Sequence, residues 1–186
     1  MRKTINPKAW MCPNPVLIIA CYKKNDDVSI MNAAWGGIVD NDLLGITLSK
    51  EHDTTKSILK NKYFTVSIGT KEMVKSCDYV GIVSGNKEKD KFKKSGFTCT
   101  KSANINAPII NELPLCFECK LEKYDDQLEY MLCKIEHISI DDSILDIKGN
   151  VDMNKFNPIV FNPLNNTYQQ LGSIVDKAFG CGLNQK

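Results

Sequence analysis

The stretch Met31-Asn32-Ala33-Ala34-Trp35-Gly36-Gly37 is the most informative part of the sequence. It places small residues and two glycines inside a segment that otherwise reads as one β-strand, from Ile30 to Val39. Small residues and glycine weaken a strand interior, so their presence there indicates close approach of another backbone or of a ligand. A strand packed tightly on a helix and a strand that receives a ligand both fit this pattern. Taken alone, these residues favour the packed strand.

Short segments rich in β-forming residues surround this stretch, and turn residues separate them, as in a β-sandwich or β-barrel. The first segment, Val16 to Tyr22, precedes the polar turn Asn25-Asp26-Asp27, which predicts a hairpin with the strand that follows. The strongest hairpin signal lies later, around Asp125-Asp126. The other expected strands are Leu44 to Ser49, Phe64 to Ile68, Phe97 to Lys101, Leu115 to Lys123, Glu129 to Ile140, Ile144 to Ile147 and Ile159 to Phe161.

The expected helices are few and short. Thr54 to Lys62 has Asp53 as its expected N-cap, and two further helices are expected over Lys71 to Ser76 and Lys87 to Lys94. Helices of this length do not alternate with strands in a doubly wound parallel sheet. The pattern predicts a mainly β fold, a closed or nearly closed antiparallel barrel with short packed helices, built as a single domain over residues 1–186.

The composition is that of a soluble globular protein, with 42% hydrophobic and 25% charged residues in a chain of 186. A formal charge of +2 gives no basic surface for a nucleic acid, and no segment reaches the roughly 20 apolar residues of a membrane span. The apolar run from Val16 to Tyr22 is followed by Lys23-Lys24 rather than by a cleavage site, so we expect a cytoplasmic protein without a signal peptide. The eight cysteines are scattered, mostly within apolar runs, which indicates buried reduced thiols.

The common short motifs of nucleotide and metal sites are missing. The sequence has no Gly-x-Gly-x-x-Gly turn and no Walker-type loop. Cys116 and Cys119 form the one close cysteine pair, but residues three apart on a strand point to opposite faces, and zinc would need further ligands. His52 and His137 lie far apart in the sequence. We therefore expect no metal site, and no catalytic residue is identified.

Four further stretches share an ordered pattern with the segment around Trp35. They are Ser49 to Ile58, Asp78 to Gly85 continued by Asp90-Lys91-Phe92, Ala107-Pro108 with Glu118-Cys119, and Tyr168 to Gly172 with Gly180. The ordered set resembles the flavin reductase-like family, and within it the flavoredoxins, over nearly the whole chain. Asp176 departs from the pattern, because the family more often has glycine at that place.

The resemblance implies an FMN-binding split β-barrel of antiparallel, Greek-key type, with non-covalent FMN near the interface of a homodimer. It implies an oxidoreductase that passes electrons through FMN to a protein or a small-molecule acceptor. NADH and NADPH are the candidate electron donors, and a redox protein is a candidate partner. A non-catalytic FMN carrier or sensor is the alternative function.

The resemblance also assigns residues to the two ends of FMN. Backbone N–H groups of the small-residue strand would meet the ring edge, and the N-terminus of the Thr54 helix would bind the phosphate. Hydroxyl groups of Ser49, Thr54 and Thr55 and the charge of Lys56 would add to the phosphate site. A carboxylate at Asp53 works against the phosphate assignment, and an ordinary capped surface helix is the alternative. Lys91 lies in a lysine-rich run that is otherwise expected to be solvated, and Phe161 fits ring packing and core packing equally well. The expected flavin-binding residues are Asn32, Ala33, Ala34, Trp35, Ser49, Thr54, Thr55, Lys56, Lys91 and Phe161.

Overall fold

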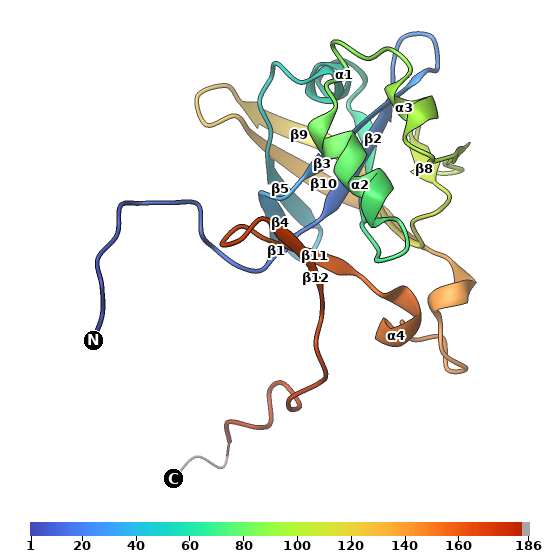
Figure 1. The fold of residues 1–186 in the computed structure, drawn as a ribbon. Coiled ribbons are helices and arrows are strands. Elements are labelled where there is room, and N and C mark those ends of the chain that lie inside the picture. Colours follow the sequence, from blue (N-terminus) through green and yellow to red (C-terminus); the bar gives the residue numbers. More distant parts are fainter. Residues whose placement is uncertain (184–186) are drawn as a thin grey trace.

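The main sheet of the computed structural model, which describes residues 1–183, has seven strands that all pair antiparallel (Figure 1). The β2–β3 and β9–β10 pairs confirm the two hairpins expected from their turns. In sheet order, the strands are β3 (Val28–Ala33), β2 (Leu17–Tyr22), β6 (Tyr63–Ile68), β9 (Leu115–Asp125), β10 (Tyr130–Ile140), β5 (Leu43–Thr47) and β4 (Gly36–Asp40).

The two edge strands of this sheet, β3 and β4, follow one another in the chain and are joined only by Ala34 and Trp35. Two residues can connect opposite edges only if the sheet curls until those edges meet. The Trp35 carbonyl oxygen accepts a 2.8 Å hydrogen bond from Thr47 N at the end of β5, which holds the link in place. The expected antiparallel split barrel is therefore confirmed as a curled half-barrel. The expected single strand from Ile30 to Val39 is wrong, because the chain changes edges within it.

Gly36 lies where the curl is tightest. A Cβ atom there would lie 2.9 Å from Leu17 Cδ1 in β2 and 3.0 Å from the Gly45 carbonyl oxygen in β5. Strands from both sides of the half-barrel thus leave no room for a side chain. The close approach that the sequence indicated is, at this position, the approach of another backbone.

Shorter elements complete the fold, and the ends of the chain extend away from the barrel (Figure 1). Within residues 1–183 no helix is long and apolar enough to cross a membrane. The elements are the helices α1 (Asp53–Asn61), α2 (Val74–Ile82), α3 (Lys91–Lys94) and α4 (Met153–Phe156), the 3-10 turn η1 (Asp142–Ile144), the pair β7 (Cys99–Lys101) and β8 (Pro108–Ile110), and a small sheet of β1 (Asn14–Pro15), β11 (Ile159–Asn162) and β12 (Thr167–Gln170).

Two apolar clusters hold these elements on the sheet. One fills the curl and joins Phe64 of β6 to Ile58 of α1, and both side chains are fully buried. The other packs the opposite face of β2 against α2, through Ile18 and Val80. Because both faces of β2 are covered, its sequence is continuously apolar rather than alternating.

The helices differ from expectation mainly in their bounds. The helix expected over Thr54 to Lys62 is confirmed as α1, but His52 rather than Asp53 occupies the N-cap position. The helix expected over Lys71 to Ser76 is displaced to α2, which continues to Ile82 because Cys77 and Val80 of its later turns are buried against the sheet. Only the last four residues of the helix expected over Lys87 to Lys94 are helical, as α3.

Two of the expected later strands are wrong or misplaced. Ile144 to Ile147 is no strand: it begins at the end of η1, where Asp141 caps the turn by accepting a hydrogen bond from Ser143 N. Ile159 to Phe161 does lie in a strand, β11, but this strand pairs with β1 and β12 and does not extend the main sheet.

Glu118 of β9 is a fully buried carboxylate, with 0% of its surface exposed. Its oxygens accept hydrogen bonds from the hydroxyl groups of Ser102 and Ser139 and from Asn104 Nδ2. Burial by itself raises the pKa of Glu118, but these hydrogen bonds and the nearby His137 lower the pKa below its usual value. Glu118 therefore acts as an anionic clamp between strand β10 and the loop that carries Ser102 and Asn104.

Replacing Glu118 by Gln tests this clamp, because the amide NH2 group would face hydrogen-bond donors instead of accepting from them. We expect the variant to lose about 1–3 kcal/mol of unfolding free energy at pH 7. Since the folded-state pKa is depressed, the carboxylate stabilises the fold fully above about pH 5 and loses this effect as the pH falls through that pKa. The gap between parent and variant in urea unfolding should therefore shrink on acidification. Glu122→Gln, on the same strand but exposed and paired with Lys120 at 3.4 Å, is the matched control. An equal loss in both variants would contradict the clamp.

Candidate functional site

Three adjoining hollows surround the end of β3, and each is named here by the element beside it. The helix hollow (about 220 Å³) lies at the start of α1, the strand hollow (about 270 Å³) lies along the β3–β4 link, and the hairpin hollow (about 390 Å³) lies under the β11–β12 hairpin. Residues that characterise them are Thr54, Gly85 and Lys91 for the first, Ala33, Trp35 and Ser49 for the second, and Asp78, Phe161 and Tyr168 for the third.

The three hollows adjoin one another through shared lining residues, and together they are called the groove below. His52 lines both the helix hollow and the strand hollow, and Ala34 lines both the strand hollow and the hairpin hollow. Gly81 of α2 separates the helix hollow from the hairpin hollow. A Cβ atom at Gly81 would lie 3.3 Å from Asn32 Cβ, so the missing side chain lets α2 lie close against β3. The groove brings together segments that are distant in the sequence.

Lys91 places an unmatched positive charge in the helix hollow. Its side chain is buried, with 7% exposed, and none of the ion pairs within residues 1–183 includes it. Burial lowers the pKa of Lys91 to about 8, although the charge of Asp53 partly opposes the shift. The side chain lines the helix hollow, and an anion bound there would stabilise its ammonium group.

Asp53 does not cancel that charge, because it is already engaged on the other side. Lys23 Nζ lies 2.8 Å from Asp53 Oδ2, and the Ser29 hydroxyl donates to the same oxygen at 2.7 Å. Burial opposes ionisation of Asp53, yet these two partners hold its pKa below the usual value. The repulsion that Asp53 would exert on an anion at this helix is therefore compensated by Lys23.

The N-terminus of α1 has free donors that face the same region. Its N-cap residue, His52, makes no side-chain hydrogen bond to the first turn. The N–H groups of a first helical turn lack partners within the helix and favour an anion. The Thr54 hydroxyl lies 3.0 Å from Ser29 Oγ, and since Ser29 donates to Asp53, Thr54 is the donor in this contact. Thr54 would have to turn away from Ser29 to donate to a ligand.

The strand hollow is built from backbone and small side chains. Within the described chain no strand pairs with the outer edge of β3, so alternate backbone groups there have no strand partner. Asn32 uses its side-chain amide to donate to the Cys77 carbonyl oxygen at 3.1 Å, which fixes the strand to α2. Ser49 donates to Glu129 Oε1 at 2.7 Å on the opposite wall, and Trp35 is 59% exposed. The hollow can present backbone donors to a flat group.

Most of the residues expected to bind flavin line this groove, but Thr55 and Lys56 do not. Thr55 is fully buried on the inner face of α1, and Lys56 pairs at 3.3 Å with Glu51 on the exposed side of the helix. Phe161 lies in the hairpin hollow, where its ring packs on Tyr168 with centroids 6.0 Å apart. The structure gathers the following expected residues: Asn32, Ala33, Ala34, Trp35 and Ser49 in the strand hollow, Thr54 and Lys91 in the helix hollow, and Phe161 in the hairpin hollow.

Several residues of the groove were missed by sequence reasoning. His52 was noted only as a lone histidine, and Ser29 gave no signal, because its role depends on a contact with residues more than twenty positions later. Asp78 and Tyr168 lay inside two of the matched stretches, but their mutual hydrogen bond of 2.9 Å spans 90 positions. Motif matching could have selected these two residues, whereas only the fold reveals that they meet.

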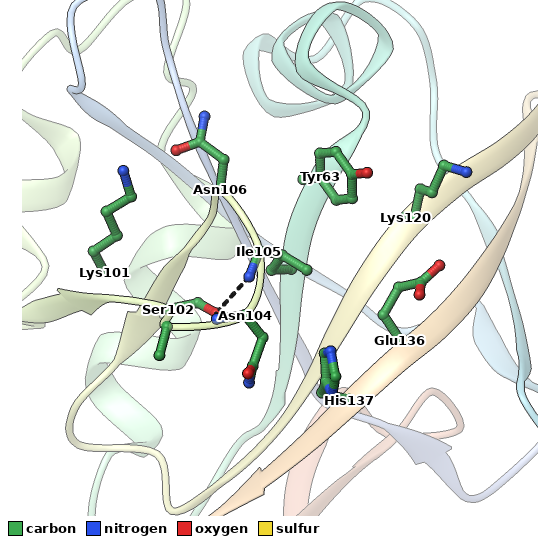
Figure 2. Close-up of a pocket in the computed structure, with 10 residues that line it drawn as sticks. Tyr63, Lys101, Ser102, Asn104, Ile105, Asn106, Lys120, Glu136 and His137 are labelled. Carbon is green, nitrogen blue, oxygen red and sulfur yellow. Dashed lines mark hydrogen bonds between the residues drawn. The ribbon is translucent and has the colours of Figure 1, made fainter.

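A larger hollow, of about 630 Å³, lies elsewhere and contains none of the expected residues. Figure 2 shows Tyr63, Lys120, Glu136 and His137 on the strands and, facing them, a loop in which Ile105 N donates to Ser102 Oγ at 3.0 Å. Its charged groups are matched in part by neighbours outside it, since Lys120 pairs with Glu122 and Glu136 with Lys134. This arrangement shows no convergent set of groups for one ligand.

Comparison with known proteins identifies the relatives of this architecture. The flavin reductase like domain matches residues 10–155. Flavoredoxin of Desulfovibrio vulgaris (Miyazaki F) has a TM-score of 0.91 and 32% identity, covering 98% of this chain and 100% of its own. A flavoredoxin from Methanosarcina acetivorans has a TM-score of 0.87 and 26% identity, with 98% of each chain covered. An uncharacterised protein of Aquifex aeolicus is 28% identical over 159 residues, 79% of either chain. The protein therefore belongs to the flavin reductase-like family, as its sequence motifs indicated.

Proposed function

We propose that the protein is an oxidoreductase that binds FMN non-covalently across the helix and strand hollows and exchanges electrons through it. The observation that carries this proposal is the largely buried Lys91 side chain, which has no ion-pair partner within residues 1–183, beside the N-terminus of α1, whose N-cap residue makes no side-chain hydrogen bond. A cation there, next to a strand edge built from small residues, matches a ligand that has a phosphate at one end and a flat ring at the other. Membership of the flavin reductase-like family supports the same cofactor.

The helix hollow fits the phosphate of FMN. Lys91 would supply the charge, and the first-turn N–H groups of α1 with the Thr54 hydroxyl would supply hydrogen bonds. Gly85 brings the loop after α2 close to Asp53, where a Cβ atom would already lie 3.0 Å from Asp53 Oδ2. The loop after α2 would thus form one wall of the phosphate site, while the positive charge of Lys23 balances the negative charge of Asp53.

The strand hollow fits the ring. Backbone donors from Asn32 to Trp35 would meet the polar edge of the ring, and the alanine side chains would let the ring lie close to the backbone. When bound, FMN supplies reversible two-electron chemistry at this site. Donors fixed on a strand before reduction stabilise the negative charge that reduction produces, because they need no reorganisation.

Three roles fit such a site: a flavin reductase that oxidises NADH or NADPH, a flavoredoxin that serves a partner protein, and a carrier or sensor without turnover. We favour the first two, because the groove continues past the strand hollow into open space that a second reactant could enter. Steady-state oxidation of NADH and NADPH, with and without added FMN, separates the roles. Saturable dependence on added FMN identifies a reductase, and tightly held FMN without pyridine-nucleotide turnover, even with electron acceptors added, identifies a carrier or sensor.

Variants of Lys91 and Thr54 test FMN binding at the phosphate. A charge-assisted hydrogen bond contributes roughly 1.5–3 kcal/mol, so Lys91→Ala should weaken FMN about tenfold or more. Thr54→Ala should weaken FMN less than this, because the hydroxyl must first leave Ser29. Riboflavin, which lacks the phosphate, should bind both variants as it binds the parent. Quenching of flavin fluorescence on titration measures all of these affinities.

Two lysines provide matched controls for that titration. Lys93 is exposed and lies 3.7 Å from Asp90, and Lys56 is paired with Glu51, so their Ala variants should bind FMN like the parent. A parent protein that fails to quench FMN fluorescence would contradict the proposal that this protein binds FMN. Equal weakening of FMN and riboflavin by Lys91→Ala would mean that Lys91 supports the fold rather than the phosphate.

The charge of Lys91 should also affect the unfolding free energy of the FMN-free protein. Its pKa in the folded protein, about 8, lies below that of the unfolded chain, so its buried charge costs stability below pH 8 and the cost fades as the pH rises toward 10.5. Lys91→Met should therefore stabilise the FMN-free protein at pH 7, by about 1–2 kcal/mol, while weakening FMN. Urea unfolding without FMN at pH 7 and pH 10 measures this. A variant less stable than the parent at pH 7 would contradict the prediction.

We also propose that two copies of the chain associate. Trp35, Ile38 and Val39 are 59%, 62% and 54% exposed along the edge strand β4 and its link, which leaves apolar surface beside unpaired backbone groups. Sedimentation of the FMN-loaded protein at micromolar concentration should give the mass of a dimer, and Ile38→Lys should lower it to that of one chain. A parent protein that sediments as a monomer would count against the dimer.

A further inference from the structure

The carboxylate of Asp53 is linked to both side chains that are proposed to bind the phosphate of FMN. Asp53, Thr54 and Lys91 all line the helix hollow. Thr54 donates to Ser29 Oγ at 3.0 Å, and Ser29 donates in turn to Asp53 Oδ2 at 2.7 Å. Burial lowers the pKa of Lys91, and the charge of Asp53 acts against this shift. The position of this one carboxylate therefore affects both proposed phosphate ligands.

A carboxylate inside an anion-binding hollow competes with the ligand. It can pair with the ammonium group that the phosphate needs, and its own charge repels the phosphate. Asp53 and Lys91 line the same hollow, yet they form no ion pair with each other within residues 1–183. Another group must therefore hold the carboxylate of Asp53.

Lys23 holds this carboxylate from the turn between β2 and β3. Its Nζ lies 2.8 Å from Asp53 Oδ2, and only 27% of the Lys23 side chain and 22% of the Asp53 side chain are exposed. The turn fixes the backbone of Lys23, because its N–H donates to the Asp27 carbonyl oxygen at 2.7 Å and its own carbonyl accepts from Asp26 N at 3.2 Å. A partly buried ion pair of this kind is screened less by salt than an exposed pair.

The other lysine that acts on Asp53, Lys89, does not make this contact. Burial raises the pKa of Asp53, the hydrogen bonds from Lys23 and Ser29 lower it, and the charge of Lys89 also lowers it. Lys89 is exposed, however, and none of the ion pairs within residues 1–183 includes it. Of the two groups in direct contact with the carboxylate, only Lys23 carries a charge.

We propose that Lys23 is a positioning residue of the phosphate site, which holds the Asp53 carboxylate so that Lys91 and Thr54 stay available to the phosphate of FMN. This inference rests on the proposed function, because it concerns one end of the same ligand. Without Lys23, the carboxylate would keep the Ser29 hydroxyl but lose its charged partner. It would then pair with Lys91 and repel the phosphate. A residue that lines none of the three hollows would thus control the affinity for the cofactor.

Lys23→Met tests this proposal, because it removes the charge and keeps most of the length of the side chain. The affinity for FMN should fall about tenfold, since an uncompensated carboxylate then lies beside the phosphate. Riboflavin, which lacks the phosphate, should bind the variant as it binds the parent. Lys23→Arg keeps the charge and should keep the parental affinity for FMN. Quenching of flavin fluorescence on titration measures each affinity.

Variants of Asp53 separate positioning from support of the fold. Asp53→Asn should bind FMN at least as tightly as the parent, because the competing charge is gone. Adding Asp53→Asn to Lys23→Met should bring the affinity for FMN back to within about twofold of the parent. An ion pair that only braced α1 against the hairpin would allow no such recovery, since the double variant lacks that pair too. Lys24→Met is the matched control, because Lys24 is exposed in the same turn and belongs to none of the ion pairs within residues 1–183.

The outcomes distinguish this inference from the proposed function. If the parent binds FMN and Lys23→Met binds it equally well, Lys23 does not position the site, and the FMN proposal stands. Equal weakening of FMN and riboflavin, or a double variant that does not recover, would assign Lys23 to the fold and overturn the inference. If the parent does not bind FMN, the proposed function fails and this inference fails with it.

Discussion

The link of Ala34 and Trp35 between the two edge strands is the constraint on which the rest of the structure depends. It forces a seven-stranded sheet to curl until its edges meet, and Gly36 permits the contact because it has no side chain. The same link leaves the outer edge of β3 without a partner strand, at the place where α1 and α2 converge. The groove is therefore a consequence of how the half-barrel closes and not an addition to it.

The arrangement of Asp53 and Lys91 in the groove lowers the free energy of unfolding of the ligand-free protein. Lys23 and Ser29, in the first hairpin, hold Asp53 as an anion, and the largely buried Lys91 side chain has no ion-pair partner within residues 1–183. A fold selected only for stability would pair or expose that ammonium group. An unmatched buried charge beside a helix N-terminus is instead what an anion-binding site needs before its ligand arrives.

Much of the fold could be predicted from the sequence, because it rests on local signals. The two hairpins were predicted from their polar turns, and helix α1 was predicted from a cap signal at Asp53, although His52 occupies the N-cap position. The site was predicted only in part. Thr54, Thr55 and Lys56 were all assigned to the phosphate, but successive helical residues point about 100° apart. Thr54 consequently faces the hollow, Thr55 the core and Lys56 the solvent. The bond between Asp78 and Tyr168 joins segments whose meeting no local signal encodes.

That long-range bond also explains how a half-barrel acquires a closed groove. A single curled sheet whose strands are all used cannot provide a wall opposite its own edge, so the wall must come from another part of the chain. The β11–β12 hairpin supplies it, held through β11 by pairing with β1 and through β12 by the hydrogen bond of Tyr168 to Asp78 of α2. Helix α2 also contacts β3, through the hydrogen bond from Asn32 to Cys77. A movement of the hairpin would therefore displace α2 and, with it, the strand that lines the strand hollow. The β11–β12 hairpin is therefore connected through packed contacts to the strand that lines the proposed flavin site. Phe161 of this hairpin lines the same hollow as Asn32 and Ala34 of that strand and its link.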